Sequence, residues 1–174
     1  KKLKLTDYKI FVGRDCPRKD IWRMQLNNEY KGTRTKSVDY ISSFFKLAYE
    51  EKLFQESGAE TILSHPNLEA DDCIALMTKY IKNNNDNDEI FIITSDKDYL
   101  QLKSDKVKIL NTKLEPVDKK MKCSEECLFI KIITGDASDN IKGIFKRCGE
   151  KTAIKYYQDR KLFEEQIKKE NVEE

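Results

Sequence analysis

The residues of this sequence with the clearest chemical potential are acidic, and they occur in four short groups. The groups are Asp15, then Glu69, Asp71 and Asp72, then Asp96 and Asp98, and finally Asp136 and Asp139. If carboxylates from different groups converged in a cleft of low dielectric, their mutual repulsion would require a compensating cation. Oxygen-only ligation favours a hard ion, so Mg²⁺ or Mn²⁺ is predicted and Zn²⁺ is not. Two such ions about 4 Å apart support phosphodiester hydrolysis, because they activate water and stabilise the leaving oxygen.

Each acidic group also has a structural interpretation. Glu69, Asp71 and Asp72 open a predicted helix, where carboxylates are favoured by the helix macrodipole and by free backbone N–H groups. Asp96 and Asp98 could form an ordinary Asp-rich turn. They directly follow a predicted strand, however, and ligands bind at the C-terminal ends of strands in open α/β sheets. Both interpretations stay open for each motif taken alone.

The hydrophobic pattern predicts the elements that position these groups. Four strands are predicted, at residues 8–13, 61–63, 89–94 and 107–110. The third is a continuous apolar run, typical of a parallel strand covered on both faces. Three helices are predicted from 3.6-residue periodicity, at residues 38–54, 68–82 and 124–134. This order predicts an α/β fold with a mainly parallel central sheet flanked by helices, and the aromatic residues Phe44, Phe45 and Tyr49 are assigned to the core.

A basic and aromatic stretch lies between the first strand and the first long helix. Its members are Arg14, Arg18, Lys19, Arg23, Lys31, Arg34 and Lys36, with Trp22 and Tyr30 interleaved. Cations neutralise phosphates and aromatic faces stack on bases, so this mixture suits a single-stranded nucleic-acid end. The alternative is a solvated basic face without a ligand.

The composition narrows the class of protein. A length of 174 residues suits one domain, and 33 basic against 31 acidic residues leave a net charge of only +2, so total charge predicts no partner. Five cysteines without a CxxC pair, together with a single histidine, argue against a disulfide framework and a zinc site. No apolar run approaches the roughly 18 residues of a membrane span, and no signal segment opens the chain. We therefore expect a soluble intracellular protein of a reducing compartment, with no membrane partner.

Taken together, five motifs resemble those of the 5′-nuclease family, which includes the N-terminal domain of bacterial DNA polymerase I and the phage flap endonucleases. In chain order they are Asp15, YKGTR at 30–34, LEADD at 68–72, TSDKDYLQL at 94–102 and TGDASDNIKG at 134–143. The resemblance extends from about residue 8 to residue 157. It implies a PIN-like fold and a metal-dependent 5′→3′ exonuclease or flap endonuclease. The implied substrate is DNA with 5′ ends or flaps, with RNA–DNA hybrids as a second candidate, and a monomer is expected.

The resemblance also implies roles for individual residues. The family's metal ligands correspond to Glu69, Asp71, Asp72, Asp96, Asp98, Asp136 and Asp139, which would hold two Mg²⁺ or Mn²⁺ ions. Lys31 and Arg23 would meet the scissile phosphate at the base of a helical arch, at about residues 16–36, and Asp15 is grouped with them as catalytic. Further DNA contacts would come from Arg14, Arg18, Trp22, Tyr30 and Arg34.

The C-terminal part of the chain, residues 135–174, resembles the helix-three-turn-helix segment that holds duplex DNA in this family. Residues 1–134 would form the nuclease core within the same compact unit. Gly143 and Gly149 would let backbone N–H groups approach a phosphate, with Lys151 and Thr152 beside them at a helix N-terminus that attracts anions. A plain turn and helix is the alternative. The resemblance further implies a K⁺ site in this segment, although Lys142 and the stretch 145–148 depart from the family pattern.

The largest departure from the family lies at the N-terminus. The family opens with a strand that delivers an Asp-Gly metal ligand, and no such strand precedes Tyr8. Because the sequence begins with Lys1 rather than Met, we expect either a fragment or a divergent member with a weakened metal site. The alternative function is therefore a catalytically weakened or inactive DNA-binding homologue that lacks the first metal-ligand Asp. A receiver-like phosphotransferase is a more remote alternative, since it has no use for GDASDN followed by a basic helix.

Overall fold

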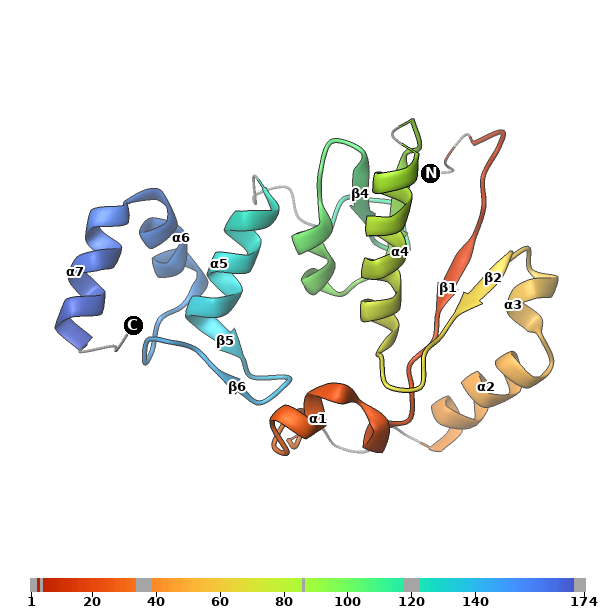
Figure 1. Cartoon of the computed structure of the whole chain (residues 1–174), viewed down its shortest axis with the longest axis horizontal. Helices are drawn as coiled ribbons and strands as arrows, with labels where there is room; N and C mark the ends of the chain where they lie inside the picture. Colours follow the sequence, from red (N-terminus) through yellow and green to blue (C-terminus); the bar gives the residue numbers. More distant parts are fainter. Residues whose placement is uncertain (1–2, 4, 34–38, 86, 118–122, 171–174) are drawn as a thin grey trace. The chain divides into compact units, whose positions relative to one another are not determined.

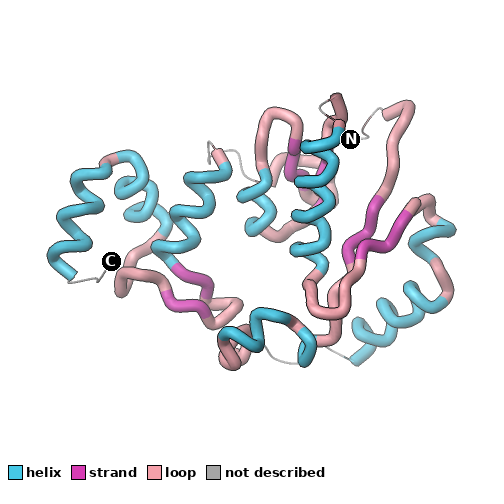
Figure 2. The backbone as a smooth tube through the Cα atoms, viewed as in Figure 1, coloured by secondary structure: helices cyan, strands magenta, loops and turns pink. Residues whose placement is uncertain are grey.

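The computed structural model describes residues 3, 5–33, 39–85, 87–117 and 123–170 (Figure 1). The chain forms two compact units, Lys1–Asp88 and Glu89–Glu174. Both contain short strands and helices, as the tube in Figure 2 shows, so the predicted α/β class is confirmed. Among the described residues the strands form three separate two-stranded sheets rather than the single central sheet that was predicted, because each named strand has only one paired neighbour.

The first unit is built around a parallel pair of strands. Strands β1 (Phe11–Gly13) and β2 (Thr61–Leu63) lie within the predicted segments, and helix α4 (Ala70–Asn84) packs against both. Gly13 permits this close approach, since a Cβ there would lie 2.9 Å from the carbonyl oxygen of Ala70. The C-terminal end of β1 therefore meets the start of α4, where the acidic motif lies.

Short helices connect the two strands of this unit. They are η1 (Arg18–Asp20), α1 (Trp22–Leu26), α2 (Asp39–Glu50) and α3 (Leu53–Glu56). The prediction of one helix over 38–54 is wrong, because Lys52 takes a left-handed conformation (φ 54°) that separates α2 from α3. The core assignment of Phe44 and Phe45 is also wrong: they are 59% and 47% exposed, whereas Ala48 of the same helix is buried.

The second unit contains another parallel pair. Strands β3 (Ile90–Ile93) and β4 (Val107–Leu110) are joined through helix η2 (Lys97–Leu102), and Val107 is completely buried. The prediction that the first of these strands is covered on both faces is wrong at its end, where Ile93 is 55% exposed.

A helix and a tight hairpin follow in the second unit. Helix α5 (Ser124–Thr134) has the predicted bounds and leads directly into the antiparallel strands β5 (Gly135–Asp136) and β6 (Ile141–Lys142). Gly135 has a φ of +72°, and a Cβ there would lie 2.2 Å from the backbone nitrogen of Gly143. Only glycine fits this close crossing, which fixes the TGDASDN loop at the end of α5.

Two further helices complete the second unit, namely α6 (Glu150–Gln158) and α7 (Arg160–Glu170). Helix α6 packs against both α5 and α7. Their contacts are aromatic, formed by Phe129, Phe145, Tyr156, Tyr157 and Phe163. None of the helices in the described part of the chain is long and apolar enough to span a membrane.

Candidate functional site

Three of the predicted metal ligands meet at the N-terminus of α4. Glu69 is the N-cap residue, and Asp71 and Asp72 lie in the first turn. One carboxylate oxygen from each residue lies within 4.8 Å of the other two, and Glu69 is only 3% exposed. Among the residues that the structure describes, no other three acidic, His or Cys side chains form so compact a group. We call these three residues the first acidic cluster.

The structural interpretation of this motif also holds. The carboxylate of Asp72 accepts a hydrogen bond from the backbone N–H of Glu69 at 3.2 Å, as in a capping box. Asp15, from the end of β1, accepts a hydrogen bond from the backbone N–H of Ala70 at 2.7 Å. In this structure the side chain of Asp15, predicted to be catalytic, therefore holds the start of α4. Capping therefore fixes the carboxylates of the cluster at the start of α4.

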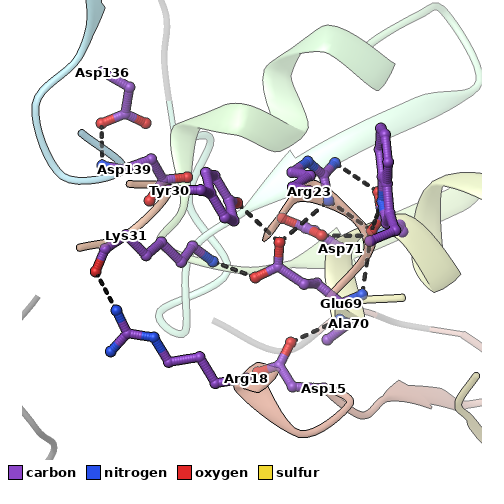
Figure 3. A network of polar contacts seen from close by, with 12 residues as sticks. Asp15, Arg18, Arg23, Tyr30, Lys31, Glu69, Ala70, Asp71, Asp136 and Asp139 are labelled. Atoms are coloured by element: carbon purple, nitrogen blue, oxygen red, sulfur yellow. Dashed lines mark hydrogen bonds and ion pairs between the residues drawn. The ribbon is translucent and has the colours of Figure 1, made fainter. Parts of the chain in front are cut away.

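Basic and aromatic side chains surround the first acidic cluster (Figure 3). Two nitrogens of the Arg23 guanidinium contact the two carboxylate oxygens of Asp72, both at 2.7 Å, and one of them also contacts Glu69 at 3.1 Å. Lys31 forms an ion pair with the other oxygen of Glu69, and the Tyr30 hydroxyl donates to Glu69 at 2.8 Å. Two cations therefore neutralise two of the three carboxylates.

A small apolar core positions the segment that supplies these cations. Cys16, Ile21 and Tyr30 are buried together, with Met24 packed against them. Lys31 follows Tyr30 with a left-handed backbone (φ 54°). Because the predicted arch base is anchored in this way, its basic side chains reach the acidic cluster from a defined direction.

Two other predicted DNA contacts reinforce the same segment. Arg18 donates to the carbonyl oxygen of Lys31 at 2.6 Å, as Figure 3 shows. The Trp22 indole N–H donates to Asp72 at 3.3 Å, and the Arg23 guanidinium lies 4.8 Å from the Trp22 ring centroid. Trp22 remains 38% exposed, so part of this aromatic side chain is accessible.

The surroundings shift the two aspartate pKa values of the cluster in opposite directions. For Asp71, burial and then the charges of Glu69 and Asp72 raise the pKa above its ordinary value. For Asp72, burial alone would raise the pKa, but the hydrogen bonds from Arg23 and from the backbone of Glu69 outweigh burial and lower it. Hydrogen bonding to Asp72 raises the pKa of Arg23 in turn. Asp71 is therefore the carboxylate of the cluster whose negative charge is least compensated.

The remaining predicted ligands lie in the second unit. Asp96 caps η2 by accepting a hydrogen bond from the backbone N–H of Asp98 at 2.9 Å. Asp98 and Asp136 both contact the ammonium group of Lys131, with each N–O distance 2.6 Å. The other oxygen of Asp136 accepts hydrogen bonds from the backbone N–H groups of Ser138 and Asp139, at 2.8 and 3.2 Å.

We call Asp98, Asp136 and Lys131 the second cluster. Burial alone would raise the pKa of Asp136, but hydrogen bonds from Lys131 and Ser138 lower it to about 2. Burial alone would lower the pKa of Lys131, but its hydrogen bonds to Asp136 and Asp98 raise it. The second cluster is thus a charged triad with its own internal cation.

Lys131 is the residue of this region that sequence reasoning missed. It lies in the last turn of α5, within the otherwise apolar run CLFIKII. A single cation in an apolar helix end, five residues before Asp136, is the signal that would have identified it. A positive charge is also favoured at this position by the helix macrodipole.

The other predicted DNA contacts have ordinary structural positions. Gly149 is the N-cap of α6, and Lys151 and Thr152 lie exposed in its first turn, as predicted for that helix start. The Arg14 guanidinium lies 4.5 Å from the Tyr49 ring centroid. Gly143, another predicted DNA contact, packs against the backbone of α5 at Ile133 and Thr134, and Arg34 lies outside the described residues.

The fold is similar to those of solved bacteriophage T5 proteins. It resembles bacteriophage T5 D15 protein co-crystallised with metal ions, with a TM-score of 0.64 and 22% identity over 85% of this chain and 58% of that chain. It also resembles bacteriophage T5 5′-exonuclease with bound zinc, with a TM-score of 0.63 and the same identity, over 85% of this chain and 57% of that one.

Sequence comparison identifies the family. Residues 2–136 match the family described as 5′-3′ exonuclease, N-terminal resolvase-like domain, and the chain belongs to this family. It is 35% identical to a 5′-3′ exonuclease of Mycoplasmopsis pulmonis, over 76% of this chain and 45% of that protein. It is 32% identical to DNA polymerase I of Mycobacterium tuberculosis, over 78% of this chain and 16% of that protein. The chain thus spans less than half the length of these relatives.

Proposed function

We propose that this protein is a divalent-metal-dependent 5′→3′ exonuclease or flap endonuclease that hydrolyses phosphodiester bonds near the 5′ ends of DNA. The observation that carries this proposal is the first acidic cluster, a compact oxygen-only group surrounded by Arg23 and Lys31. Membership of the 5′-3′ exonuclease family supports the reaction class. A flap endonuclease of similar fold, from bacteriophage T5, has been crystallised with DNA and metal ions, which supports the substrate class.

The proposed metal ligands are carboxylates throughout. Glu69, Asp71 and Asp72 would hold one ion, because their oxygens already approach one another within the range that a single hard cation can draw together. Asp96, Asp98, Asp136 and Asp139 are proposed as ligands of a second ion. Mg²⁺ or Mn²⁺ fits this donor set, and such ions supply Lewis-acid stabilisation and a water of lowered pKa when bound.

Basic residues of the first unit would bind the substrate. Arg23 and Lys31 are held close to the carboxylates by ion pairs. Each would therefore contact a phosphate that binds next to the metal. A guanidinium that contacts both oxygens of Asp72 has the fork geometry that also suits a phosphate. Trp22 and Tyr30 would offer aromatic faces to bases of a single-stranded 5′ end. RNA within an RNA–DNA hybrid is a second candidate substrate.

We further propose that residues 135–170 act as a duplex-binding helix-three-turn-helix segment. The start of α6 supports this, because Gly149 has no side chain to cover the free backbone N–H groups and Lys151 adds a positive charge beside them. The tight hairpin at Gly135 and Gly143 fixes the TGDASDN loop, which precedes α6. We also propose that this loop binds a K⁺ ion and that the protein acts as a monomer.

A second candidate function is a DNA-binding homologue with weak or no catalysis. One observation favours it: the ion pairs of Arg23 and Lys31 neutralise Glu69 and Asp72, so side chains of the protein itself can compensate these carboxylates. Such a protein would bind a 5′ flap and not cut it.

A single assay separates these functions. The purified chain is incubated with a labelled 5′-flap duplex with and without Mg²⁺, and both binding and cleavage are measured. The enzyme predicts Mg²⁺-dependent cleavage that Asp71→Asn abolishes and that the surface change Glu60→Gln preserves. Flap binding without cleavage at any Mg²⁺ or Mn²⁺ concentration would favour the binding homologue, and absence of both would contradict the two proposals.

A further inference from the structure

We propose that Lys131 is a built-in competitor of the divalent ion at the second cluster, so that its side chain sets the metal affinity of Asp98 and Asp136. This inference rests on the proposed function, because it assumes that these aspartates are metal ligands. It goes beyond that function by assigning a role to a residue that lies outside all the recognised motifs.

The geometry of the triad carries the argument. The Lys131 ammonium nitrogen lies 2.6 Å from one oxygen of Asp98 and 2.6 Å from one oxygen of Asp136. A Mg²⁺ ion bound to the same two oxygens would lie about 2.1 Å from each. Two cations cannot share that space, because the ion and the ammonium group would overlap and repel each other. A divalent ion can therefore bridge these oxygens only after Lys131 leaves them.

The surroundings allow such an exchange. Lys131 and Asp98 each have 34% of their side chains exposed, so the ammonium group can move to solvent without being stranded in an apolar interior. Asp136 is held more firmly, with 11% exposure and backbone hydrogen bonds from Ser138 and Asp139 on its other oxygen. Asp136 thus stays in place while the divalent ion replaces the ammonium group of Lys131.

Removal of Lys131 distinguishes competition with the divalent ion from structural support of the two aspartates. If Lys131 only held Asp98 and Asp136 together, its removal would loosen both carboxylates and weaken metal binding. If it competes, its removal leaves two uncompensated carboxylates and strengthens metal binding. The two roles therefore predict changes of opposite sign.

The test is a Mn²⁺ titration of the whole chain, monitored by the electron paramagnetic resonance signal of free Mn²⁺. The Asp71→Asn background weakens the first acidic cluster so that the second is observed. In that background Lys131→Met should bind Mn²⁺ about fivefold more tightly, which is the change expected when two partly exposed ion pairs no longer have to be broken. The shift in melting temperature on adding Mn²⁺ should also increase.

Two variants control for charge and for folding. Lys131→Arg restores the cation and should return the affinity to within about twofold of the background. Lys108→Met removes a surface ion pair with Glu89 in the same unit and should leave the affinity unchanged. If Lys131→Met does not fold, Lys131→Gln is measured in its place.

Unchanged or weaker Mn²⁺ binding in the Lys131 variant would overturn the inference while leaving the proposed function intact. Failure of the proposed function has a different signature. In that case the wild-type chain and an Asp136→Asn variant would show the same absence of Mn²⁺ binding.

Discussion

Both clusters hold carboxylates close together, and they differ in the cations that compensate the repulsion between them. In the first, Arg23 and Lys31 reach Glu69 and Asp72 from a separate segment more than 30 residues earlier in the chain. In the second, the cation is Lys131, which lies five residues before Asp136 and 33 residues after Asp98. Both arrangements join residues that are distant in the chain, but the side chains of Lys31 and Glu69 are 15% and 4% exposed whereas those of Lys131 and Asp98 are both 34% exposed. Loss of the first should therefore affect folding most, and loss of the second should affect mainly the ions that it can bind.

One uncompensated negative charge remains in each cluster, but its position differs. In the first cluster burial and the charges of Glu69 and Asp72 raise the pKa of Asp71. In the second, Lys131 contacts both of the aspartates that define the cluster. We therefore expect the first acidic cluster to take up a divalent ion more readily, because binding there relieves existing repulsion.

The largest expected effect is that of Glu69→Gln. The side chains of Glu69 and Lys31 are only 4% and 15% exposed, so the change leaves Lys31 and Arg23 without their counter-charge in a confined space. We expect a loss of about 3 kcal/mol in the free energy of unfolding, measured by urea denaturation. Glu60→Gln, which removes an exposed ion pair with Lys9, is the matched control and should leave the free energy of unfolding almost unchanged. Equal losses in the two variants would show that the first cluster has no special structural role.

The second prediction contrasts two lysines from the two units. Lys31→Ala should lower turnover on a 5′-flap duplex about a hundredfold with a smaller change in DNA affinity, because we expect Lys31 to act where charge develops. Lys151→Ala should weaken DNA binding and reduce its salt dependence by about one unit of slope, with turnover at saturating DNA almost unchanged. Cleavage rates and salt-dependent binding isotherms measure both quantities. Equal losses of turnover at unchanged affinity would contradict the assignment.

The third prediction concerns acid stability in the second cluster. The pKa of Asp136 is lowered to about 2 from an ordinary value of 3.8, so its stabilising contribution is complete above about pH 4 and is lost as the pH falls towards 2. Asp136→Asn should therefore cost about 1–2 kcal/mol at neutral pH and almost nothing near pH 2. Unfolding curves between pH 2 and 7 measure this difference. A constant difference across that range would show that the charge of Asp136 is not its source.

The smallest expected effect is that of Asp71→Asn without metal. The raised pKa of Asp71 means that its charge destabilises the folded state at neutral pH, and this penalty disappears as the pH falls below its ordinary value of 3.8. The variant should be slightly more stable than the wild type at pH 7 and indistinguishable from it in acid. Thermal melts in a chelating buffer measure this difference, and a destabilised variant at pH 7 would contradict like-charge repulsion at this cluster.

The sequence predicted what depends on local pattern. The strands at residues 61–63 and 107–110 and the helix at 124–134 have the predicted bounds, because hydrophobic periodicity and turn residues determine them. The acidic group at α4 was predicted for the same reason, since its residues are close in the sequence.

The errors concern properties that neighbours in space determine. Periodicity alone could not show that Lys52 interrupts a helix or that Phe44 is 59% exposed. Basic charge in the first segment suggested phosphate contacts, but it did not show that Arg23 pairs with Asp72, which is 49 residues away. Lys131 was missed because its sequence signal, a single cation in an apolar helix end, does not show which carboxylates it contacts.

The central proposal is that the first acidic cluster holds a divalent ion, which requires Arg23 and Lys31 to give up part of their contacts with its carboxylates. A crystal structure of the chain in saturating Mn²⁺, with anomalous diffraction measured at the manganese edge, tests this claim most directly. The account predicts an anomalous peak bound by oxygens of Glu69, Asp71 and Asp72, with the Arg23 guanidinium withdrawn from at least one oxygen of Asp72. No peak at these carboxylates, with the Arg23–Asp72 ion pair intact, would contradict it.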